Sequence, residues 1–304
     1  MAFNRLKAKI KGIKYLPFKQ DGKTYNLYDM PKGFVIKGNL DLSYIGLTEL
    51  PDLSEVVVKG NFDCPDNKLT SLKGAPKEVG GYFYCYRNQL TSLEGAPQTV
   101  GGIFDCHSNQ LTSLEGAPQT VGDGFRCSYN KLTSLEGAPK EIGGEFLCQS
   151  NELTSLEGVP QKVYGIFDCS YNKLRSLKGA PKEIGEYFIC RNNQLTSLVG
   201  LPLMIESGTI YCGKSLENKY GFNFDYNEEG VSYKQLCASP LYKSETAMNR
   251  VRNKLPQKIE TKPASKKQHK KVETKTKQQE EAFEKINAEF SQWLKDNSAK
   301  PTRE

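Results

Sequence analysis

The chain has 304 residues, of which 42 are Lys or Arg and 35 are Asp or Glu, and its formal net charge is +7. No apolar stretch reaches the roughly 20 residues that a membrane-spanning helix needs. Residues 1–20 place six basic residues among single apolar ones, whereas a secretion signal needs a continuous apolar run of about 7–15 residues. We therefore expect neither a helical membrane protein nor a secreted protein with a cleaved leader.

The first 37 residues precede a long stretch of regular repeats. We expect residues 1–37 to form an N-terminal cap, because the end coil of a repeat array would otherwise expose its core. Leu40 and Leu42 already follow the pattern of the later coils, but Ile45 stands where those coils have Asn. The repeats therefore start with an atypical coil.

A repeat of 21 residues occupies the middle of the chain, and cysteine marks it most clearly. The copy at residues 83–102 reads FYCYRNQLTSLEGAPQTVGG. A period of about 20–29 residues with Leu and Asn at fixed offsets predicts a solenoid, since one coil cannot bury its apolar side alone. The repeated cysteines are Cys64, Cys85, Cys106, Cys127, Cys148, Cys169 and Cys190, followed by Cys212 one residue later than the period predicts.

This repeat resembles that of the leucine-rich repeat family. The family pattern L-x-x-L-x-L-x-x-N-x-L is met with Phe and Cys in the two strand positions, over about residues 38–213. The short Gly-Ala-Pro return is similar to the 21-residue repeats of bacterial and bacteriophage members. The resemblance implies a β-rich solenoid with a parallel sheet on its concave face and little or no helix on the return side.

Within each coil, Phe and Cys alternate with a period of two, so we expect a short strand with both side chains pointing inward. Neighbouring strands lie about 4.8 Å apart, so equivalent residues should form ladders of Phe, Cys and Leu. The repeated Asn lies where the strand bends away, and its inward amide is expected to bond the backbone of the loop. These residues are Asn67, Asn88, Asn109, Asn130, Asn151, Asn172 and Asn193.

Eight of the nine cysteines fall on one inward ladder, where a free thiol acts as a small apolar side chain. No C-x-x-C or C-x-x-H pair occurs, so we predict no metal site and no cofactor. A buried file of thiols favours a reducing compartment. We expect the cytoplasm, or the host-cell cytoplasm if the protein is phage-encoded or injected. The state of Cys237 stays open.

Function should lie on the outward strand positions, which vary while the inward ones stay constant. Tyr and Arg recur there, as they do in protein interfaces. The densest group covers residues 82–87. The residues predicted to bind a partner are Tyr82, Tyr84, Tyr86, Arg87, Asp105, His107, Arg126, Tyr129, Asp168, Tyr171, Tyr187 and Arg191.

The same face offers little for catalysis. Asp105 and Asp168 should lie three coils apart, about 14 Å, which is too far for a paired-carboxylate mechanism. We expect Asp105 to form a cross-strand ion pair with Arg126 and His107 to be isolated on a wet surface. The inward thiols are poor nucleophiles because apolar burial raises a thiol pKa. The sequence therefore predicts a protein that is not an enzyme.

After the repeats, residues 214–240 should form a C-terminal cap, and period-two apolar residues from Tyr220 to Tyr226 predict a strand or hairpin within it. Residues 241–277 have the composition of a basic disordered linker. Residues 250–277 alone hold 11 Lys or Arg against two acidic residues, so nucleic acid is a possible partner there.

Residues 278–297 follow the spacing of an amphipathic helix with an acid-rich polar side, which disfavours membrane insertion. Such a helix can dock on the solenoid, pair with a copy of itself or enter a groove on a partner. Its apolar contact residues are Phe283, Ile286, Phe290, Trp293 and Leu294.

Taken together, these features predict a protein-protein interaction protein. The concave face would bind a protein partner, and the tethered helix would make a second contact. Two alternatives stay open: a nucleic-acid-associated protein that uses its basic tail, or a structural component of a phage particle or another assembly.

Overall fold

The computed structural model describes residues 15–212, 231–238 and 243. The chain divides into two compact units, Met1–Glu245 and Thr246–Glu304, and all described residues belong to the first. The hairpin predicted at Tyr220–Tyr226, the helix predicted at 278–297 and the linker apart from residue 243 lie outside the described residues.

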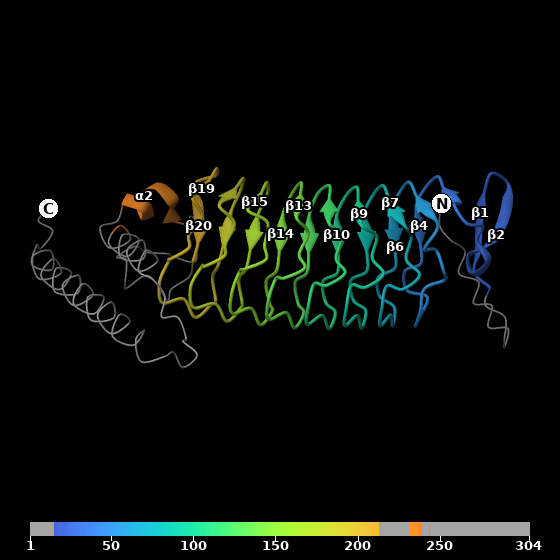
Figure 1. The fold of residues 1–304 in the computed structure, drawn as a ribbon, viewed down its shortest axis with the longest axis horizontal. Coiled ribbons are helices and arrows are strands. Elements are labelled where there is room, and N and C mark those ends of the chain that lie inside the picture. Colours follow the sequence, from blue (N-terminus) through green and yellow to red (C-terminus); the bar gives the residue numbers. More distant parts are fainter. Residues whose placement is uncertain (1–14, 213–230, 239–242, 244–304) are drawn as a thin grey trace, which may run out of the picture. The chain divides into compact units, whose positions relative to one another are not determined.

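The described chain is a β-solenoid with almost no helix (Figure 1). Each repeated Phe begins a two-residue strand that pairs in parallel with the same strand of the next coil, for example Phe104 with Phe125. We call this sheet the Phe sheet. Its parallel strands are β4 (Leu40–Asp41), β6 (Phe62–Asp63), β8 (Phe83–Tyr84), β10 (Phe104–Asp105), β12 (Phe125–Arg126), β14 (Phe146–Leu147), β16 (Phe167–Asp168), β18 (Phe188–Ile189) and β20 (Thr209–Tyr211).

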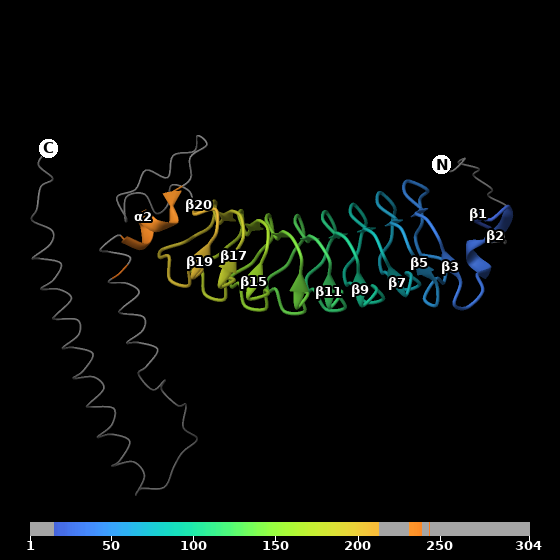
Figure 2. The ribbon, with the colours of Figure 1, turned by 90° about the horizontal axis from the view of Figure 1, so that it is seen from above.

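The return side of the coils also contains parallel strands, which the sequence analysis did not predict. They end at a buried Val or Ile and run side by side in Figure 2. Six of them form one sheet: β3 (Val35–Ile36), β5 (Val57–Val58), β7 (Glu78–Val79), β9 (Thr99–Val100), β11 (Thr120–Val121) and β13 (Glu141–Ile142). Three more form another: β15 (Lys162–Val163), β17 (Glu183–Ile184) and β19 (Met204–Ile205).

The gap between these two return sheets coincides with a change in the residue that follows the strand. In most coils a glycine follows the return strand, and a Cβ on Gly143 would lie only 2.0 Å from the backbone oxygen of Gly122. Neighbouring coils therefore approach closely at this position. Tyr164 replaces that glycine after β15, and the return ladder is interrupted between β13 and β15. Lys59 and Glu206 replace the glycine after β5 and β19, yet both of these strands pair with the preceding return strand, so the loss of glycine alone does not explain the break.

Between the sheets lies one core, built from the ladders that the sequence predicts. The Phe side chains from Phe62 to Phe188 are fully buried, with centroids of successive rings 5.1 to 5.8 Å apart. Every repeated Leu and all eight ladder cysteines are also buried, and the thiols are free. The predicted inward orientation of these residues is confirmed.

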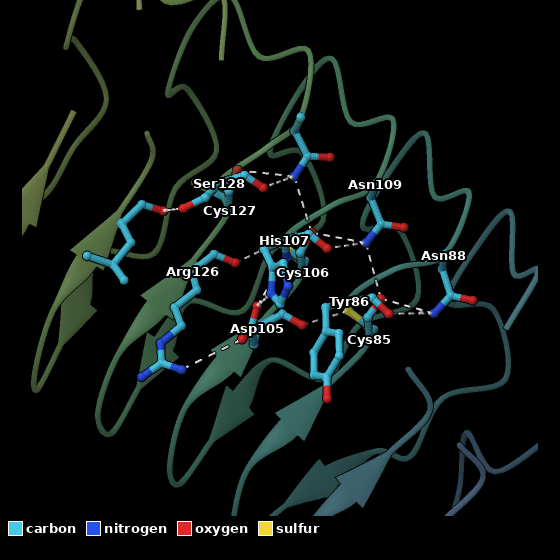
Figure 3. A network of polar contacts seen from close by, with 12 residues as sticks. Cys85, Tyr86, Asn88, Asp105, Cys106, His107, Asn109, Arg126, Cys127 and Ser128 are labelled. Carbon is cyan, nitrogen blue, oxygen red and sulfur yellow. Dashed lines mark hydrogen bonds and ion pairs between the residues drawn. The ribbon is translucent and has the colours of Figure 1, made fainter. Parts of the chain in front are cut away.

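An asparagine amide links each coil to the one before it. The Oδ1 atom of Asn109 accepts a hydrogen bond of 3.0 Å from the Leu90 amide of the preceding coil. Its Nδ2 atom donates to the carbonyl of Cys85 in that coil at 3.1 Å and to the carbonyl of Cys106 in its own coil at 3.0 Å (Figure 3). The predicted role of the repeated Asn is confirmed.

Both ends of the described solenoid depart from the repeat. At the start, β1 (Pro17–Gln20) and β2 (Lys23–Asn26) form an antiparallel hairpin, and the short 3₁₀ helix η1 (Leu27–Asp29) buries Leu27. At the other end, β21 (Val231–Ser232) pairs antiparallel with β20 and leads into α2 (Tyr233–Ala238), which buries Leu236. No helix among the described residues is long and apolar enough to cross a membrane.

The asparagine ladder gives a first testable prediction. Replacing Asn130 by Ala leaves the Leu111 amide without its side-chain acceptor and removes one hydrogen bond from each of the Cys106 and Cys127 carbonyls, which keep the bond from a neighbouring Asn. We expect the free energy of unfolding to fall by about 3 kcal/mol, because buried polar groups lose their hydrogen bonds. Urea denaturation measures this loss. The matched control Lys131→Ala, at an exposed neighbouring position, should change it by less than about 0.5 kcal/mol.

Candidate functional site

The candidate site is the outward side of the Phe sheet and of the turns that follow its strands, which we call the strand face. Since Phe and Cys point inward, the residues beside them point outward. The parallel register then sets the neighbours: Asp63 lies beside Tyr84, and Asp105 lies beside Arg126. Side chains from successive coils therefore meet in rows across this face.

Three tyrosines and one histidine form a continuous row of rings on this face. The ring centroids of Tyr82 and Tyr84 are 5.5 Å apart, and those of Tyr84 and Tyr86 are 5.9 Å apart. Tyr86 stacks on His107 of the next coil, with a centroid distance of 4.6 Å and an interplanar angle of 16°. Tyr82 is 38% exposed, and the other rings are partly buried. We call these four residues the aromatic row.

The expectation that His107 is isolated is wrong. Its Nδ1 atom lies 2.7 Å from Oδ1 of Asp105, and its backbone amide donates to the same oxygen at 3.1 Å (Figure 3). The carboxylate itself is almost fully buried, with only 4% of Asp105 exposed. His107 is therefore held between a carboxylate and the ring of Tyr86.

The expected ion pair between Asp105 and Arg126 is present, with 3.8 Å between Nη1 and Oδ2. The shorter contact of Arg126 is to Glu145, whose Oε1 lies 2.7 Å from Nη2 and 2.8 Å from Nε. Glu145 is not among the residues predicted to bind a partner. Glu145 directly precedes Phe146, whose strand β14 pairs with the strand of Arg126. This position in the repeat could have predicted the contact. Charges from three successive coils thus form one network.

At the start of the face, two carboxylates each have one oxygen without a hydrogen bond among the described residues. Oδ1 of Asp63 and Oδ2 of Asp66 are buried and have no hydrogen-bond partner among the described residues. Burial and the nearby charge of Asp41, on the neighbouring strand, raise the pKa of Asp63 to about 6. The other oxygen of Asp66 lies 3.8 Å from Nη1 of Arg87. Neither aspartate is among the residues predicted to bind a partner.

Three predicted residues occupy the same left-handed position in the turn after the strand. Arg87, Tyr129 and Tyr171 have φ angles of 51°, 55° and 53°. Such angles are uncommon for bulky side chains. Tyr129 and Tyr171 are 59% and 49% exposed, so the turn holds their rings out of the coil.

The remaining predicted residues lie further along the strand face. Strands β12 and β14 separate Asp105 from Asp168, as predicted. Asp168 accepts hydrogen bonds from the amide and hydroxyl of Ser170 at 2.9 and 2.5 Å. Tyr187 meets Tyr211 edge to face at 5.9 Å. The predicted residues therefore do not form a single cluster. The helix residues Phe283, Ile286, Phe290, Trp293 and Leu294 lie outside the described residues.

Among the described residues, no three His, Cys, Asp or Glu side chains gather as a metal site would require. Burial raises the pKa of the ladder thiols, for instance those of Cys85 and Cys169. These thiols stay protonated and face the core.

No protein-family model matches the chain, and no curated protein matches it. A functional assignment therefore rests on the geometry of the strand face and on the sequence.

The raised pKa of Asp63 gives a second prediction. With a pKa of about 6 against the ordinary 3.8, the folded protein binds this proton more tightly than the unfolded chain does. The charged carboxylate therefore lowers stability increasingly as the pH rises from about 4 to about 6. We expect Asp63→Asn to raise the free energy of unfolding at neutral pH by about 1 kcal/mol, allowing for partial exposure to solvent.

Thermal unfolding at several pH values between about 4 and about 7 measures this gain. The gain should shrink as the pH falls, and a gain that is independent of pH would contradict the assignment. Asp52→Asn is the matched control. Hydrogen bonds from the hydroxyl and amide of Ser54 lower the pKa of Asp52, so this variant should lose stability at neutral pH instead.

Proposed function

We propose that this chain is a non-enzymatic protein-interaction protein of the leucine-rich repeat type, and that its strand face binds a protein partner. The aromatic row of Tyr82, Tyr84, Tyr86 and His107 is the observation that carries the proposal. Tyr and Arg supply much of the binding energy in protein interfaces. A row of partly exposed rings is therefore a suitable centre for such a contact.

The way in which these rings are held supports the proposal. A side chain that is already fixed loses less conformational entropy on binding. Each ring in the row contacts the next, and His107 is fixed by Asp105. Beside the row, Arg126 is held by two carboxylates. The face is thus largely preorganised before a partner arrives.

The contrast between the two sides of the coils also supports this choice of face. The inward residues are almost identical in every coil, and packing accounts for them. The outward residues of the strand differ from coil to coil. On the loop side, four successive coils have the same acidic residue at the equivalent position: Glu94, Glu115, Glu136 and Glu157. Recognition needs variety of shape and charge, so the strand face is the stronger candidate.

The proposal includes a second contact through the helix predicted at residues 278–297. A weak contact joined to another by a linker gains from a high effective concentration. The apolar stripe with Trp293, the one Trp of the chain, supports this role or self-association in a larger assembly such as a phage particle. The buried file of free thiols supports a reducing compartment, for which we propose the cytoplasm or that of a host cell.

An affinity experiment tests the strand face. The full chain is immobilised and exposed to nuclease-treated lysate of the cells that produce it, beside a variant with Tyr82, Tyr84, Tyr86 and Arg87 all changed to Ala. We expect a protein partner to bind the native chain and to be reduced at least about tenfold with the variant, since interface Tyr and Arg each contribute about 1–2 kcal/mol or more.

The matched control changes Glu94, Glu115, Glu136 and Glu157 to Ala on the loop side and should retain the partner. Thermal unfolding of both variants checks that each one folds. Equal capture of the partner by the native chain and by the folded tyrosine variant would contradict binding at the strand face.

A second candidate function rests on charge. Residues 240–304 hold 16 basic and 9 acidic residues, which leaves 26 of each for residues 1–239, so the tail supplies the whole excess. Such an excess favours contact with nucleic acid phosphates. No aromatic residue lies between Tyr242 and Phe283, so bases would find no stacking surface and the binding would not depend on sequence.

Salt dependence tests this candidate. If residues 250–277 bind DNA, affinity for a duplex of arbitrary sequence should fall steeply with salt, with a logarithmic slope of about −0.9 per phosphate contacted. A variant without residues 250–277 should lose the binding. Fluorescence anisotropy at several salt concentrations measures both. Undiminished binding by the shortened variant would rule the segment out as the DNA site.

A further inference from the structure

The turn after each strand of the Phe sheet presents one residue outward in a fixed direction. This residue has a positive φ angle, between 51° and 57°, in coil after coil. Its backbone amide also donates to a carbonyl of the next coil, for example from Ser150 to Ser170 at 3.0 Å. Equivalent residues therefore lie one strand spacing apart and point the same way. We call them the turn file: Tyr44, Asp66, Arg87, Ser108, Tyr129, Ser150, Tyr171 and Asn192.

Long and short side chains alternate along the turn file. The three tyrosines are 49% to 59% exposed, and the side chain of Arg87 is 61% exposed. Every second coil thus holds a flat group out toward solvent. With strands about 4.8 Å apart, these groups recur about every 9.6 Å. The long members are Tyr44, Arg87, Tyr129 and Tyr171, and the short members are Asp66, Ser108, Ser150 and Asn192.

The tyrosines of this file do not serve the fold. At φ angles of 55° and 53°, Tyr129 and Tyr171 have a conformation that bulky residues rarely adopt. Asp and Asn tolerate it better, and Asp66 and Asn192 occupy the same position in other coils. Core packing gives no reason for a large ring here, because both side chains are exposed. Backbone strain of this kind is typical of residues that clamp a ligand.

The spacing of the flat groups indicates the conformation of the ligand. A polyproline II helix repeats every three residues, or about 9.3 Å. Over the four coils from Arg87 to Tyr171, two of its turns differ from the turn file by only about 0.6 Å. Seven residues of an α-helix span about 10.5 Å, so two such repeats differ by about 1.8 Å. Alternate residues of an extended strand lie about 6.8 Å apart and do not match the period.

A row of charges beside the turn file adds a second requirement. Lys131, Glu152 and Lys173 each follow a member of the turn file by two residues. Nζ of Lys173 lies 2.8 Å from Oε2 of Glu152. The hydrogen bond from Lys173, together with the charges of Lys173 and Lys131, lowers the pKa of Glu152. Two lysines thus share one glutamate, and the excess positive charge beside the tyrosines complements an acidic residue on the ligand.

We propose that the turn file receives a proline-rich segment of the partner protein in the polyproline II conformation. Two prolines three residues apart pack on Tyr129 and Tyr171, and an acidic residue of the segment lies near Lys131. Aromatic surfaces are the usual docking sites of such helices, whose extended backbone is ordered before binding. This inference rests on the proposed function, because it names the class of protein segment that the strand face would bind.

Selection from a random peptide library tests the inference. A phage library of 12-residue peptides, which span about 37 Å as a polyproline II helix, is selected on the full chain. We expect enrichment of prolines three residues apart. A synthetic copy of the strongest peptide should lose at least about tenfold in affinity when one of these prolines is moved by one residue, because one of the two contacts is then lost. Fluorescence anisotropy measures this affinity.

The protein side of the test uses Tyr129→Asn with Tyr171→Asn. This double variant should bind the peptide at least about tenfold more weakly. Its urea midpoint should be unchanged or higher, because Asn fits the left-handed turn better than Tyr does, which separates lost binding from lost folding. The matched control is Tyr164→Asn, which removes a 58% exposed ring from the return side and should bind the peptide as the native chain does.

Three outcomes would overturn the inference: no selected peptide with prolines three residues apart, equal binding by the folded double variant, or equal affinity after a proline is moved. The proposed function is tested separately by the variant with Tyr82, Tyr84, Tyr86 and Arg87 changed to Ala. A lysate partner that this variant loses and the Tyr129→Asn, Tyr171→Asn variant retains would contradict the inference and leave binding at the strand face in place.

Discussion

The hydrogen bonds of the repeated asparagine are the interaction on which the rest of this structure depends. A coil of 21 residues must turn sharply after its strand, and the turn leaves backbone amides and carbonyls facing the core. The amide of Asn109, for example, bonds the backbone of its own coil and of the preceding coil at once. Buried polar atoms are thereby satisfied, and the coils are fixed in register so that Phe and Leu can stack.

Constant register on the inside makes variation on the outside possible. Because inward packing and the asparagine bonds hold each coil, its outward residues are not needed for the fold. The strand face can therefore carry an aromatic row, a charge network and carboxylates that lower stability. Asp63 is the clearest instance, since burial and Asp41 disfavour its charge at neutral pH. Residues that lower the stability of the folded protein are expected at functional surfaces more than elsewhere.

Close approach of the backbones on the return side depends on glycine. Gly101, Gly122 and Gly143 each lie so near the preceding coil that a side chain would collide with its backbone oxygen. The return ladder breaks between β13 and β15, yet the Phe sheet continues through the same coils. The two sides of the solenoid are thus held by different constraints. The Phe sheet, which carries the candidate site, is continuous through the described coils.

The sequence by itself determined the inward half of this protein. Phe, Cys, Leu and Asn recur at fixed offsets, and a stacked coil has one way to bury them, so the Phe sheet, its ladders and the role of Asn were predictable. Only the tertiary structure revealed the return sheets. Each return strand contains one buried apolar residue, such as Val100, and one residue cannot show the period-two alternation that predicts a strand. The tertiary structure also decided which outward side chains meet: His107 with Asp105, Arg126 with Glu145, and none with Oδ1 of Asp63 among the described residues. Packing dictates an inward position, whereas an outward contact depends on the rotamers and neighbours of several coils at once.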